Sequence, residues 1–334
     1  MTDGLKGCGE TLSAHYDVAL LDLDGVVYMS GASIPGAPEA LRRAAAGGMR
    51  LAYVTNNAYR TPSAVAAALA GFGVPATAQD VVTSAQAAAR LLAEHLPAGS
   101  AVLVVGGTGL RAEVRARGLR PVSTAADKPA AVVQGYAPGV GYDLLAEGGL
   151  AVGAGALFVL TNADPTLPTP HGRTPGNGSM GRVIATATGV EPLVAGKPEP
   201  TLHAESVERT GARRPLVVGD RLDTDIEGAC RVGADSLLVL TGVSGPADVL
   251  LAPPGQRPSY LAEGLAGLLE PHPEVTKNGD EFGCRGWTAR WSGSRLGLKG
   301  DGEQIDALRA LAAAAWSARE VTRKAAEAAA ALLT

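Results

Sequence analysis

The chain has 334 residues, of which 46% are hydrophobic and 19% are charged, and its net charge at pH 7 is −4. This composition is typical of a globular enzyme, the length predicts more than one domain, and the acidic balance argues against nucleic acid as a partner. The first residues form no apolar signal segment, and no apolar run approaches the ~20 residues that span a bilayer, so we expect a cytoplasmic protein with no membrane insertion.

Short apolar segments alternate with Ala-rich helical patterns through most of the chain. Strands and helices that alternate at this spacing predict βαβ units, whose parallel sheets are buried on both faces. Ligands bind beyond the carboxyl ends of the strands in such sheets, so polar residues at those ends are the candidates for chemistry. In chain order, the expected strands are residues 18–21, 51–54, 101–105, 131–133, 158–160, 216–218 and 237–240, and the expected helices are residues 38–46, 62–70, 85–94 and 200–209.

The last part of the chain has a different pattern. All of its Trp residues lie there, after a segment at residues 271–280 that contains Pro and charged residues and that we expect to be a linker. Segments 287–291 and 295–298 predict two short strands. The Ala/Leu-rich segment 301–333 predicts one long helix or two shorter ones. We therefore predict a separate small β–β–α module over residues 280–334, with no catalytic constellation of its own.

Two aspartates, Asp22 and Asp24, directly follow the first expected strand. Side chains two positions apart point the same way in an extended segment, so we expect both carboxylates to face one site. One carboxylate can attack phosphorus to give an aspartyl-phosphate, while the other protonates the leaving alkoxide and later activates water. Gly25 lets the chain turn sharply after them. A helix-capping or turn role, without catalysis, is equally consistent with these residues alone.

Thr55, Asn56 and Asn57 follow the strand expected at residues 51–54. A hydroxyl and backbone N–H groups at the junction of a strand and a helix suit a phosphoryl oxygen. An N-cap followed by an Asx turn explains the same residues without any ligand. Both interpretations stay open at this point.

A lysine and a second group of acidic residues lie further along the chain. Lys197, between a glycine and a proline, has a restrained backbone and can neutralise phosphoryl charge, although most lysines are solvated surface groups. Asp220 follows the strand expected at 216–218 and is the natural inner ligand of Mg²⁺, which prefers oxygen ligands. Asp225 could hold a metal-bound water or the lysine from the second coordination shell. The alternative is an acidic helix N-terminus that complements the helix dipole.

The order of these groups is more informative than any one of them. Asp-x-Asp, then Thr, then Lys, then Gly-Asp-x₄-Asp supplies a nucleophile, a proton shuttle, a phosphate-binding hydroxyl, a neutralising cation and a metal ligand. If Asp22, Asp24 and Asp220 gather at one place, their like charges repel strongly. The set therefore predicts Mg²⁺ as part of the site.

Six short motifs occur in order over about residues 17–270. They are Asp22–Tyr28 (DLDGVVY), Val54–Asn57 (VTNN), Thr161–Asp164 (TNAD), Pro175–Gly178 (PGNG), Gly196–Pro198 (GKP) and Gly219–Ile226 (GDRLDTDI). Together they resemble the haloacid dehalogenase superfamily of phosphatases, which have a Rossmann-like parallel-sheet core. The similarity is greatest to the subgroup of NagD-like nucleotidases, 4-nitrophenylphosphatases and mammalian phosphoglycolate and pyridoxal phosphate phosphatases.

The resemblance implies a role for each group. The implied roles are nucleophile for Asp22, general acid/base for Asp24, phosphate binding for Thr55 and Asn56, and charge neutralisation for Lys197. It also implies that Mg²⁺ is ligated by Asp22, Asp220 and the main-chain carbonyl of Asp24. These roles are the ones that the residue types suggested, with the carbonyl of Asp24 added.

The spacing of the motifs indicates the domains. Between Asp22 and Thr55 there are 33 positions, enough for one crossover helix, whereas 142 separate Thr55 from Lys197, far more than one βα unit. The long gap must hold a domain of its own, which in the resembled family is an α/β cap over the active site. We predict a hydrolase core at residues 1–83 and 191–272, the inserted cap at 84–190, and the C-terminal extension at 280–334.

The cap should select the substrate, because the core motifs contact only the phosphoryl group. The turn-rich loop at residues 164–177 follows an expected strand, and Leu167, His171 and Arg173 are the candidates to reach the leaving group. A solvated loop histidine is the stronger interpretation of His171. Aromatic residues make up only 4% of the chain, which argues against a stacking pocket for a base or a pyridine ring.

A phosphatase of this subgroup with a short tail resembles the actinobacterial glycerol 3-phosphate phosphatases, whose tail is similar to a fragment of an acetyltransferase fold. No tail residue indicates acetyl transfer. We therefore expect hydrolysis of a small phosphorylated metabolite, with glycerol 3-phosphate favoured and phosphoglycolate, pyridoxal phosphate or a nucleoside monophosphate as alternatives. A phosphoester-binding regulatory module is the alternative from a different class, and a homo-oligomer stays open.

Overall fold

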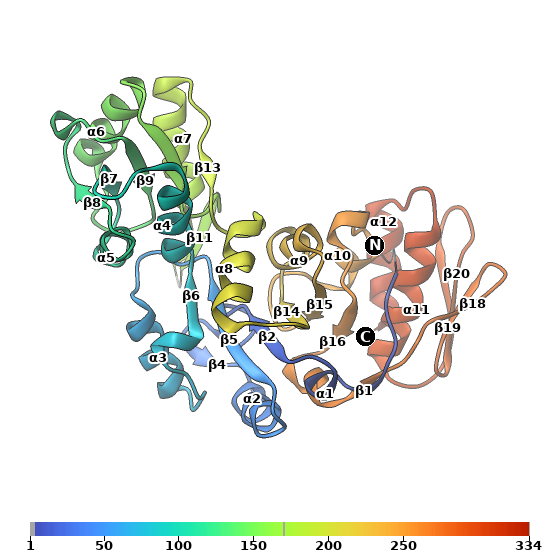
Figure 1. The fold of residues 1–334 in the computed structure, drawn as a ribbon. Helices are drawn as coiled ribbons and strands as arrows, with labels where there is room; N and C mark the ends of the chain where they lie inside the picture. The colour runs from blue at the N-terminus through green and yellow to red at the C-terminus, as the bar shows by residue number, and fades with distance from the viewer. Residues whose placement is uncertain (1–3, 170, 334) are drawn as a thin grey trace. The chain divides into compact units, whose positions relative to one another are not determined.

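The computed structural model describes residues 4–169 and 171–333, and the chain forms two compact units (Figure 1). The first unit comprises Met1–Ala52, Phe72–Pro75 and Thr210–Thr334, and the second comprises Tyr53–Gly71 and Ala76–Arg209. Both units contain the alternation of strand and helix that the sequence predicts. Within the described ranges, no helix is both long and apolar enough to cross a membrane.

A parallel sheet forms the centre of the first unit. Its strands pair with Leu21 opposite Val218 and with Gly219 opposite Leu238. The side chains of these strands are almost all buried, as expected for continuous runs of Val, Leu and Ala that are covered on both faces. In spatial order the strands are β16 (Tyr260–Ala262), β15 (Asp235–Val239), β14 (Pro215–Gly219), β2 (Val18–Leu21) and β5 (Arg50–Thr55), and the two units divide within β5.

Short helices and turns connect these strands. Helix α2 (Ala37–Ala46) follows Gly36 and has a proline in its first turn, where a missing backbone donor costs nothing. Strand β1 (Cys8–Thr11) pairs with β17 (Pro271–His272), and a small hairpin follows the first aspartates. The remaining elements are α1 (Leu12–His15), β3 (Tyr28–Met29), β4 (Ala32–Ser33), the π-helical turn η3 (Leu222–Ile226), α9 (Glu227–Val232), α10 (Pro246–Leu250), η4 (Pro254–Gln256) and η5 (Leu265–Leu269).

A second parallel sheet forms the centre of the second unit. In spatial order its strands are β13 (Leu193–Val194), β10 (Leu157–Leu160), β9 (Ala131–Gln134), β7 (Ala101–Val105) and β8 (Arg120–Val122). Apolar side chains of the sheet, such as Val132 and Phe158, pack with Ile184 in one buried cluster. The helices of this part are α4 (Ser84–His95), α5 (Thr108–Ala116), α6 (Tyr142–Gly153) and α7 (Asn177–Thr188).

The rest of the second unit leads to and from this sheet. Strand β6 (Val81–Thr83) pairs in parallel with β5, with Thr83 opposite Thr55. Thr83 then begins α4 with a capping box, in which the Thr83 hydroxyl accepts from the Gln86 N–H and the Gln86 side chain accepts from the Thr83 N–H. The other elements are α3 (Pro62–Gly71), η1 (Ala78–Asp80), η2 (Ala125–Asp127), β11 (Thr166–Thr169), β12 (Gly172–Pro175) and α8 (Pro200–Thr210).

The predicted α/β class is confirmed, since each expected strand and helix of these sheets forms with boundaries within two residues of the expected ones. The sheet strands that the sequence did not indicate, β6, β8, β13 and β16, have two or three residues each. Segments that short give no alternation to detect. Strand β8 also has a proline in its middle, which is tolerated because β8 lies at the edge of its sheet.

The C-terminal part contains more strands than the sequence indicated. Over residues 276–330, four antiparallel strands precede two helices, which is two strands more than the predicted β–β–α extension has. Strand β18 (Thr276–Asn278) lies in the expected linker, and its residues are polar and exposed, which gives no apolar pattern. The other elements are β19 (Glu281–Cys284), β20 (Trp287–Trp291), β21 (Leu296–Gly300), α11 (Gln304–Ser317) and α12 (Arg323–Ala330).

The C-terminal part packs against the sheet of the first unit. One cluster of buried apolar side chains contains Leu238 and Leu261 of that sheet together with Leu308 of α11. At the same contact, Arg309 pairs with Asp306 and donates to the carbonyl of Leu261. The C-terminal part therefore shares a hydrophobic core with the first unit.

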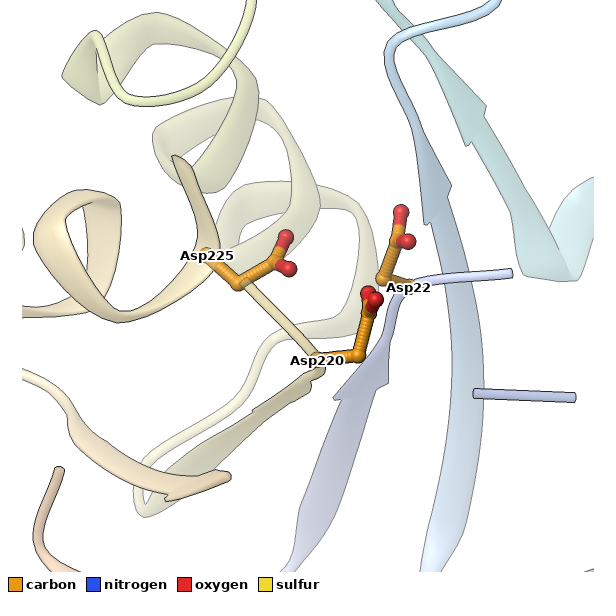
Figure 2. A group of neighbouring side chains, drawn as sticks. All are labelled: Asp22, Asp220 and Asp225. Carbon is orange, nitrogen blue, oxygen red and sulfur yellow. The ribbon is translucent and has the colours of Figure 1, made fainter. Parts of the chain in front are cut away.

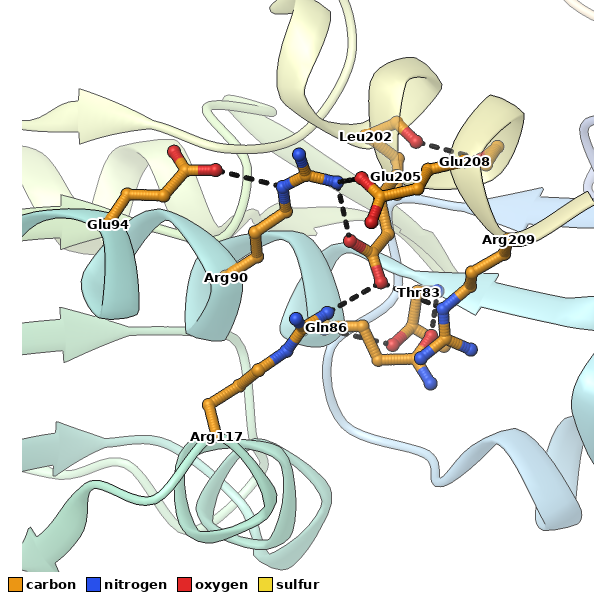
Figure 3. A network of polar contacts seen from close by, with 10 residues as sticks. Thr83, Gln86, Arg90, Glu94, Arg117, Leu202, Glu205, Glu208 and Arg209 are labelled. Atoms are coloured by element: carbon orange, nitrogen blue, oxygen red, sulfur yellow. Dashed lines mark hydrogen bonds and ion pairs between the residues drawn. The ribbon is translucent and has the colours of Figure 1, made fainter. Parts of the chain in front are cut away.

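A buried carboxylate, that of Glu205 on α8, joins helical segments of the second unit (Figure 3). Its side chain is 3% exposed. It accepts hydrogen bonds from Arg209 of α8 at 2.8 Å, from Arg117 beyond α5 at 2.7 Å and from Arg90 of α4 at 3.2 Å. Burial alone would raise the pKa of this carboxyl, but the hydrogen bond from Arg209, the charge of Arg117 and the hydrogen bond from Arg90 outweigh burial and lower the pKa.

Replacing Glu205 by Gln should destabilise the protein by about 1–3 kcal/mol, because Arg90, Arg117 and Arg209 lose a buried ionic partner while they keep access to water. Since the pKa is lowered in the folded state, this contribution is present above the unfolded pKa of about 4.3 and is lost as the pH falls through the folded value. Denaturant unfolding of the full chain near neutral pH and near pH 3 measures both effects.

The matched control is Glu94→Gln, which changes an exposed partner of Arg90. It should shift the free energy of unfolding by less than about 0.5 kcal/mol. Equal shifts for Glu205→Gln and Glu94→Gln would contradict the assignment of stability to the buried carboxylate.

Candidate active site

Two of the predicted acidic residues follow neighbouring strands at the same edge of the first unit's sheet. Asp22 comes directly after β2 and Asp220 directly after β14, and these strands pair in parallel. The Asp22 N–H donates to the Val218 carbonyl at 2.8 Å, which extends the pairing to the first aspartate. The carboxyl ends of β2 and β14 therefore bring both aspartates to one place.

Among the residues that the structure describes, three carboxylates gather at this edge, those of Asp22, Asp220 and Asp225 (Figure 2). Their oxygens lie within 4.8 Å of one another, and Asp220 and Asp225 are 1% exposed. Asp225 reaches the group through the tight turn η3. Its approach also requires glycine at position 219, because a Cβ there would lie 2.2 Å from the Asp225 Cβ. Like charges this close need a cation, and oxygen ligands are those that Mg²⁺ prefers. The donor set fits the predicted ion.

Asp24, the predicted proton shuttle, lies in the turn after β2. The strand ends at Leu21, and the Val27 N–H donates to the Leu23 carbonyl at 2.9 Å, so the extended spacing assumed from the sequence does not continue through Asp24. Its side chain is exposed and is not one of the group of Asp22, Asp220 and Asp225; the Tyr28 hydroxyl lies 3.4 Å from its Oδ2. An exposed carboxyl can take up and release protons, as a general acid/base must.

In the second unit, Asn56 holds the main chain of Lys197. Its Oδ1 accepts from the Lys197 N–H at 2.9 Å, and its amide donates to the Lys197 carbonyl at 3.2 Å. The Lys197 side chain is buried, and its Nζ donates to the Val54 carbonyl at 3.3 Å. Residue 196 must be small, since a Cβ on Gly196 would lie 2.6 Å from Asn56 Oδ1. The structure thus brings Asn56 and Lys197 together and uses the amide of Asn56 to orient the lysine.

Thr55 and Asn57 make local contacts. The Thr55 hydroxyl accepts from the Asn57 N–H at 3.1 Å. Asn57 Oδ1 accepts from the N–H groups of Tyr59 and Arg60, at 2.9 and 3.1 Å. The side chain of Asn57 therefore forms the Asx turn that was the alternative interpretation of the sequence.

The candidates for the leaving group lie on the hairpin of β11 and β12 in the second unit. Leu167 pairs with Thr174, and Arg173 pairs with Pro168, so the side chains of Leu167 and Arg173 project to opposite faces of the hairpin. A cavity of ≈ 310 Å³ in the second unit is lined from the hairpin by Thr169, Thr174 and Pro175, and Leu167 pairs with Thr174. His171 is exposed at the turn. The hairpin does not bring the three candidates to one point.

Two residues that the sequence analysis left without a role support Asn56. Ser84 Oγ and Asn162 Nδ2 both donate to the Asn56 carbonyl, at 2.6 and 2.8 Å. Ser84 follows β6 and Asn162 follows β10, so both stand beyond the carboxyl end of a parallel strand. The rule that indicated the aspartates would have found Ser84 if the short strand β6 had been detected, and it applies to Asn162 after the expected strand β10.

Known proteins resemble the chain over most of its length. A haloacid dehalogenase-like hydrolase model matches residues 19–120, a HAD-hydrolase-like model matches residues 194–268, and a GCN5-related N-acetyltransferase-like domain model matches residues 284–334. D-glycerol 3-phosphate phosphatase of Mycobacterium tuberculosis is 44% identical over 319 residues, which is 93% of this chain and 88% of that protein. The chain belongs to the haloacid dehalogenase-like hydrolase family.

Two further comparisons extend this result. Chronophin of Rattus norvegicus is 40% identical over 267 residues, which is 75% of this chain and 86% of that protein. The solved structure of the M. tuberculosis glycerol phosphate phosphatase in complex with magnesium has a TM-score of 0.85 and 44% identity, covering 93% of this chain and 94% of that one. The superfamily and fold identified from the motifs are confirmed, and the magnesium in that relative agrees with the predicted cofactor.

Because the carboxylates of Asp22, Asp220 and Asp225 repel one another, Mg²⁺ should raise the melting temperature of the protein. Asp220→Asn removes one charge at constant size. We expect this variant to melt at the same or a higher temperature without Mg²⁺ and to lose most of the rise that Mg²⁺ causes. Thermal melts with and without Mg²⁺ measure both quantities.

The matched control for this melt is Asp223→Asn. Asp223 lies three residues after Asp220, is exposed and pairs with Arg221. This variant should keep the full rise with Mg²⁺. A rise of wild-type size in Asp220→Asn would show that Asp220 is not a ligand.

Proposed function

We propose that the protein is a Mg²⁺-dependent phosphomonoester hydrolase in which Asp22 is the nucleophile. The observation that carries this proposal is the place of Asp22, which stands at the end of β2 beside the buried carboxylates of Asp220 and Asp225. When bound, Mg²⁺ neutralises charge on these carboxylates and on the phosphoryl group. Membership of the haloacid dehalogenase-like hydrolase family supports the same chemistry.

The reaction has two steps on the residues of the chain. A carboxylate oxygen of Asp22 forms a bond to phosphorus, the bond from phosphorus to the leaving alkoxide breaks, and Asp24 gives that alkoxide its proton. Asp24, now ionised, takes a proton from water as the water oxygen attacks phosphorus. Phosphate leaves, Asp22 returns to its carboxylate form, and Asp24 is again protonated.

The proposal assigns the remaining residues the roles that the sequence predicted. Thr55 and Asn56 bind phosphoryl oxygens, and Lys197 neutralises their charge, in a chain whose cap lies at residues 84–190. The pair of hydrogen bonds between the Asn56 side chain and the main chain of Lys197 supports a cation that is held in a fixed orientation before substrate binds. The cytoplasmic location remains a prediction, and the oligomeric state is left open.

The proposed substrate is glycerol 3-phosphate, which would give glycerol and phosphate. The named activity of the M. tuberculosis relative supports this choice, since that protein matches 93% of the chain. A match of that extent must reach into the C-terminal part, whereas the match to chronophin covers 75% of the chain. Leu167, which pairs with the cavity-lining Thr174, is the candidate to contact the leaving group.

Asp22→Asn should lower kcat for phosphate release by at least ~10³-fold, because an amide is not a nucleophile toward phosphorus. Asp24→Asn should also abolish turnover, but it should keep the Mg²⁺-dependent rise in melting temperature, because it removes a proton shuttle and no side-chain ligand. Phosphate release and thermal melts on the same preparations measure both. Equal turnover in wild type and Asp22→Asn would refute the mechanism.

The substrate is tested with a panel of phosphomonoesters ranked by kcat/KM. We expect glycerol 3-phosphate to rank above phosphoglycolate, pyridoxal phosphate and nucleoside monophosphates. If a different ester has the highest kcat/KM and Asp22→Asn is inactive on it, the reaction type is retained and glycerol 3-phosphate is rejected as the substrate.

A further inference from the structure

A short loop between β15 and α10, residues 240–245, contacts both acidic segments of the site. None of the six sequence motifs covers this loop, and its residues Gly242 and Val243 are exposed to solvent. Its contacts with the site are made by backbone N–H groups and by hydroxyls. Patterns of apolar and charged side chains do not reveal such contacts.

The loop holds Asp220 by its side chain and by its main chain. The Val243 N–H donates to Asp220 Oδ2 at 2.7 Å, and the Ser244 N–H donates to the Asp220 carbonyl at 3.0 Å. The Ser244 hydroxyl accepts from the Leu222 N–H at 3.1 Å, which fixes the chain two residues further on. The direction of the Asp220 carboxylate is therefore set by this loop.

The same loop holds the turn that carries Asp22 and Asp24. The Thr241 hydroxyl donates to the Gly25 carbonyl at 2.6 Å. Gly25 has a φ of +84°, and a Cβ there would lie 2.4 Å from Asp220 Oδ2. The turn and Asp220 thus approach each other too closely for any side chain between them. Thr241 binds the turn to this loop, and the same loop binds Asp220 through the Val243 N–H.

The approach of the loop itself depends on Gly242. A Cβ on Gly242 would lie 1.9 Å from Asp220 Oδ2, so an alanine there must displace the carboxylate or the loop. Gly245, three residues on, offers a contrast within the same loop. A Cβ on Gly245 would meet nothing nearer than Asp248 Oδ2 at 3.9 Å, and its φ of −97° suits any residue.

We propose that residues 241–244 form a positioning loop for the metal site, with Thr241 as its positioning residue. The loop fixes the Asp220 carboxylate and the Gly25 turn in one arrangement, and so strengthens Mg²⁺ binding without contributing a ligand. Hydrogen bonds to metal-binding carboxylates raise affinity by fixing their orientation before the ion arrives. The inference rests on the proposed function only in taking Asp22 and Asp220 as Mg²⁺ ligands.

The first test compares Thr241→Val with Thr241→Ser in the full chain. Valine keeps the shape of threonine and removes the donor to Gly25, whereas serine keeps the donor. Titration calorimetry with Mg²⁺ alone should give a Kd about 10-fold weaker for Thr241→Val, and Thr241→Ser should recover most of the affinity. Melting temperatures without Mg²⁺ check that both variants fold.

The second test compares Gly242→Ala with Gly245→Ala. We expect Gly242→Ala to weaken Mg²⁺ binding at least as much as Thr241→Val, and Gly245→Ala to bind as the wild type does. If Gly242→Ala does not fold, the comparison of valine with serine at position 241 decides. Mg²⁺ affinity within twofold of wild type in Thr241→Val would overturn the proposal.

Calorimetry separates this proposal from the proposed function. A wild-type protein that binds Mg²⁺ but releases no phosphate from any ester would reject the function and leave the positioning loop standing. An active wild type whose Thr241→Val variant binds Mg²⁺ normally would reject the loop and leave the function standing.

Discussion

Repulsion among the carboxylates of Asp22, Asp220 and Asp225 is the constraint on which the first unit depends. Two unit charges 4.8 Å apart repel by about 3 kcal/mol at the effective dielectric of protein sites, and the burial of Asp220 and Asp225 limits screening by water. Central strands of a parallel sheet hold this arrangement, because β2 and β14 pair on both sides and cannot separate without loss of buried area. A divalent cation reverses the sign of the interaction, so metal binding and stability of this sheet edge are coupled.

The same constraint explains why glycine occurs where segments meet. At Gly25 and Gly242 a Cβ would overlap the Asp220 carboxylate, and at Gly219 it would overlap Asp225. The carboxylates are thus packed against bare main chain, which leaves them few directions in which to relax away from one another. Backbone N–H groups, such as that of Val243, supply the partial positive charge that makes this packing tolerable.

The sequence predicted the parts of this site that depend on local pattern. Asp22 and Asp220 were found because each follows a continuous apolar segment, and such segments, alternating with helical patterns, predict buried parallel strands whose carboxyl ends meet. Asp225 was expected in the second coordination shell, and the close approach of its carboxylate to Asp22 and Asp220 depends on the tight turn η3, which no residue pattern marks. The contact of Asn56 with Lys197 joins residues 141 positions apart, so no local pattern indicates it. The contacts of Thr241 and Val243 involve a backbone carbonyl and a backbone N–H, which side-chain patterns do not reveal. Strand β18 was missed because all its residues are polar.

The C-terminal part supports the same edge of the sheet by apolar packing and by hydrogen bonds, such as that from Trp316 Nε1 to the Val249 carbonyl of α10 at 2.8 Å. Helices α11 and α12 contact α10, which directly follows the positioning loop. Leu222 and Ile226, at the two ends of the turn that carries Asp225, belong to the same buried apolar cluster as Leu308 of α11. Both supports of the carboxylate group, the loop before α10 and the turn η3, therefore rest on a core that the C-terminal part completes. A segment that supplies none of these carboxylates can in this way be needed for a metal site, because rigidity of the ligands depends on what is packed behind them.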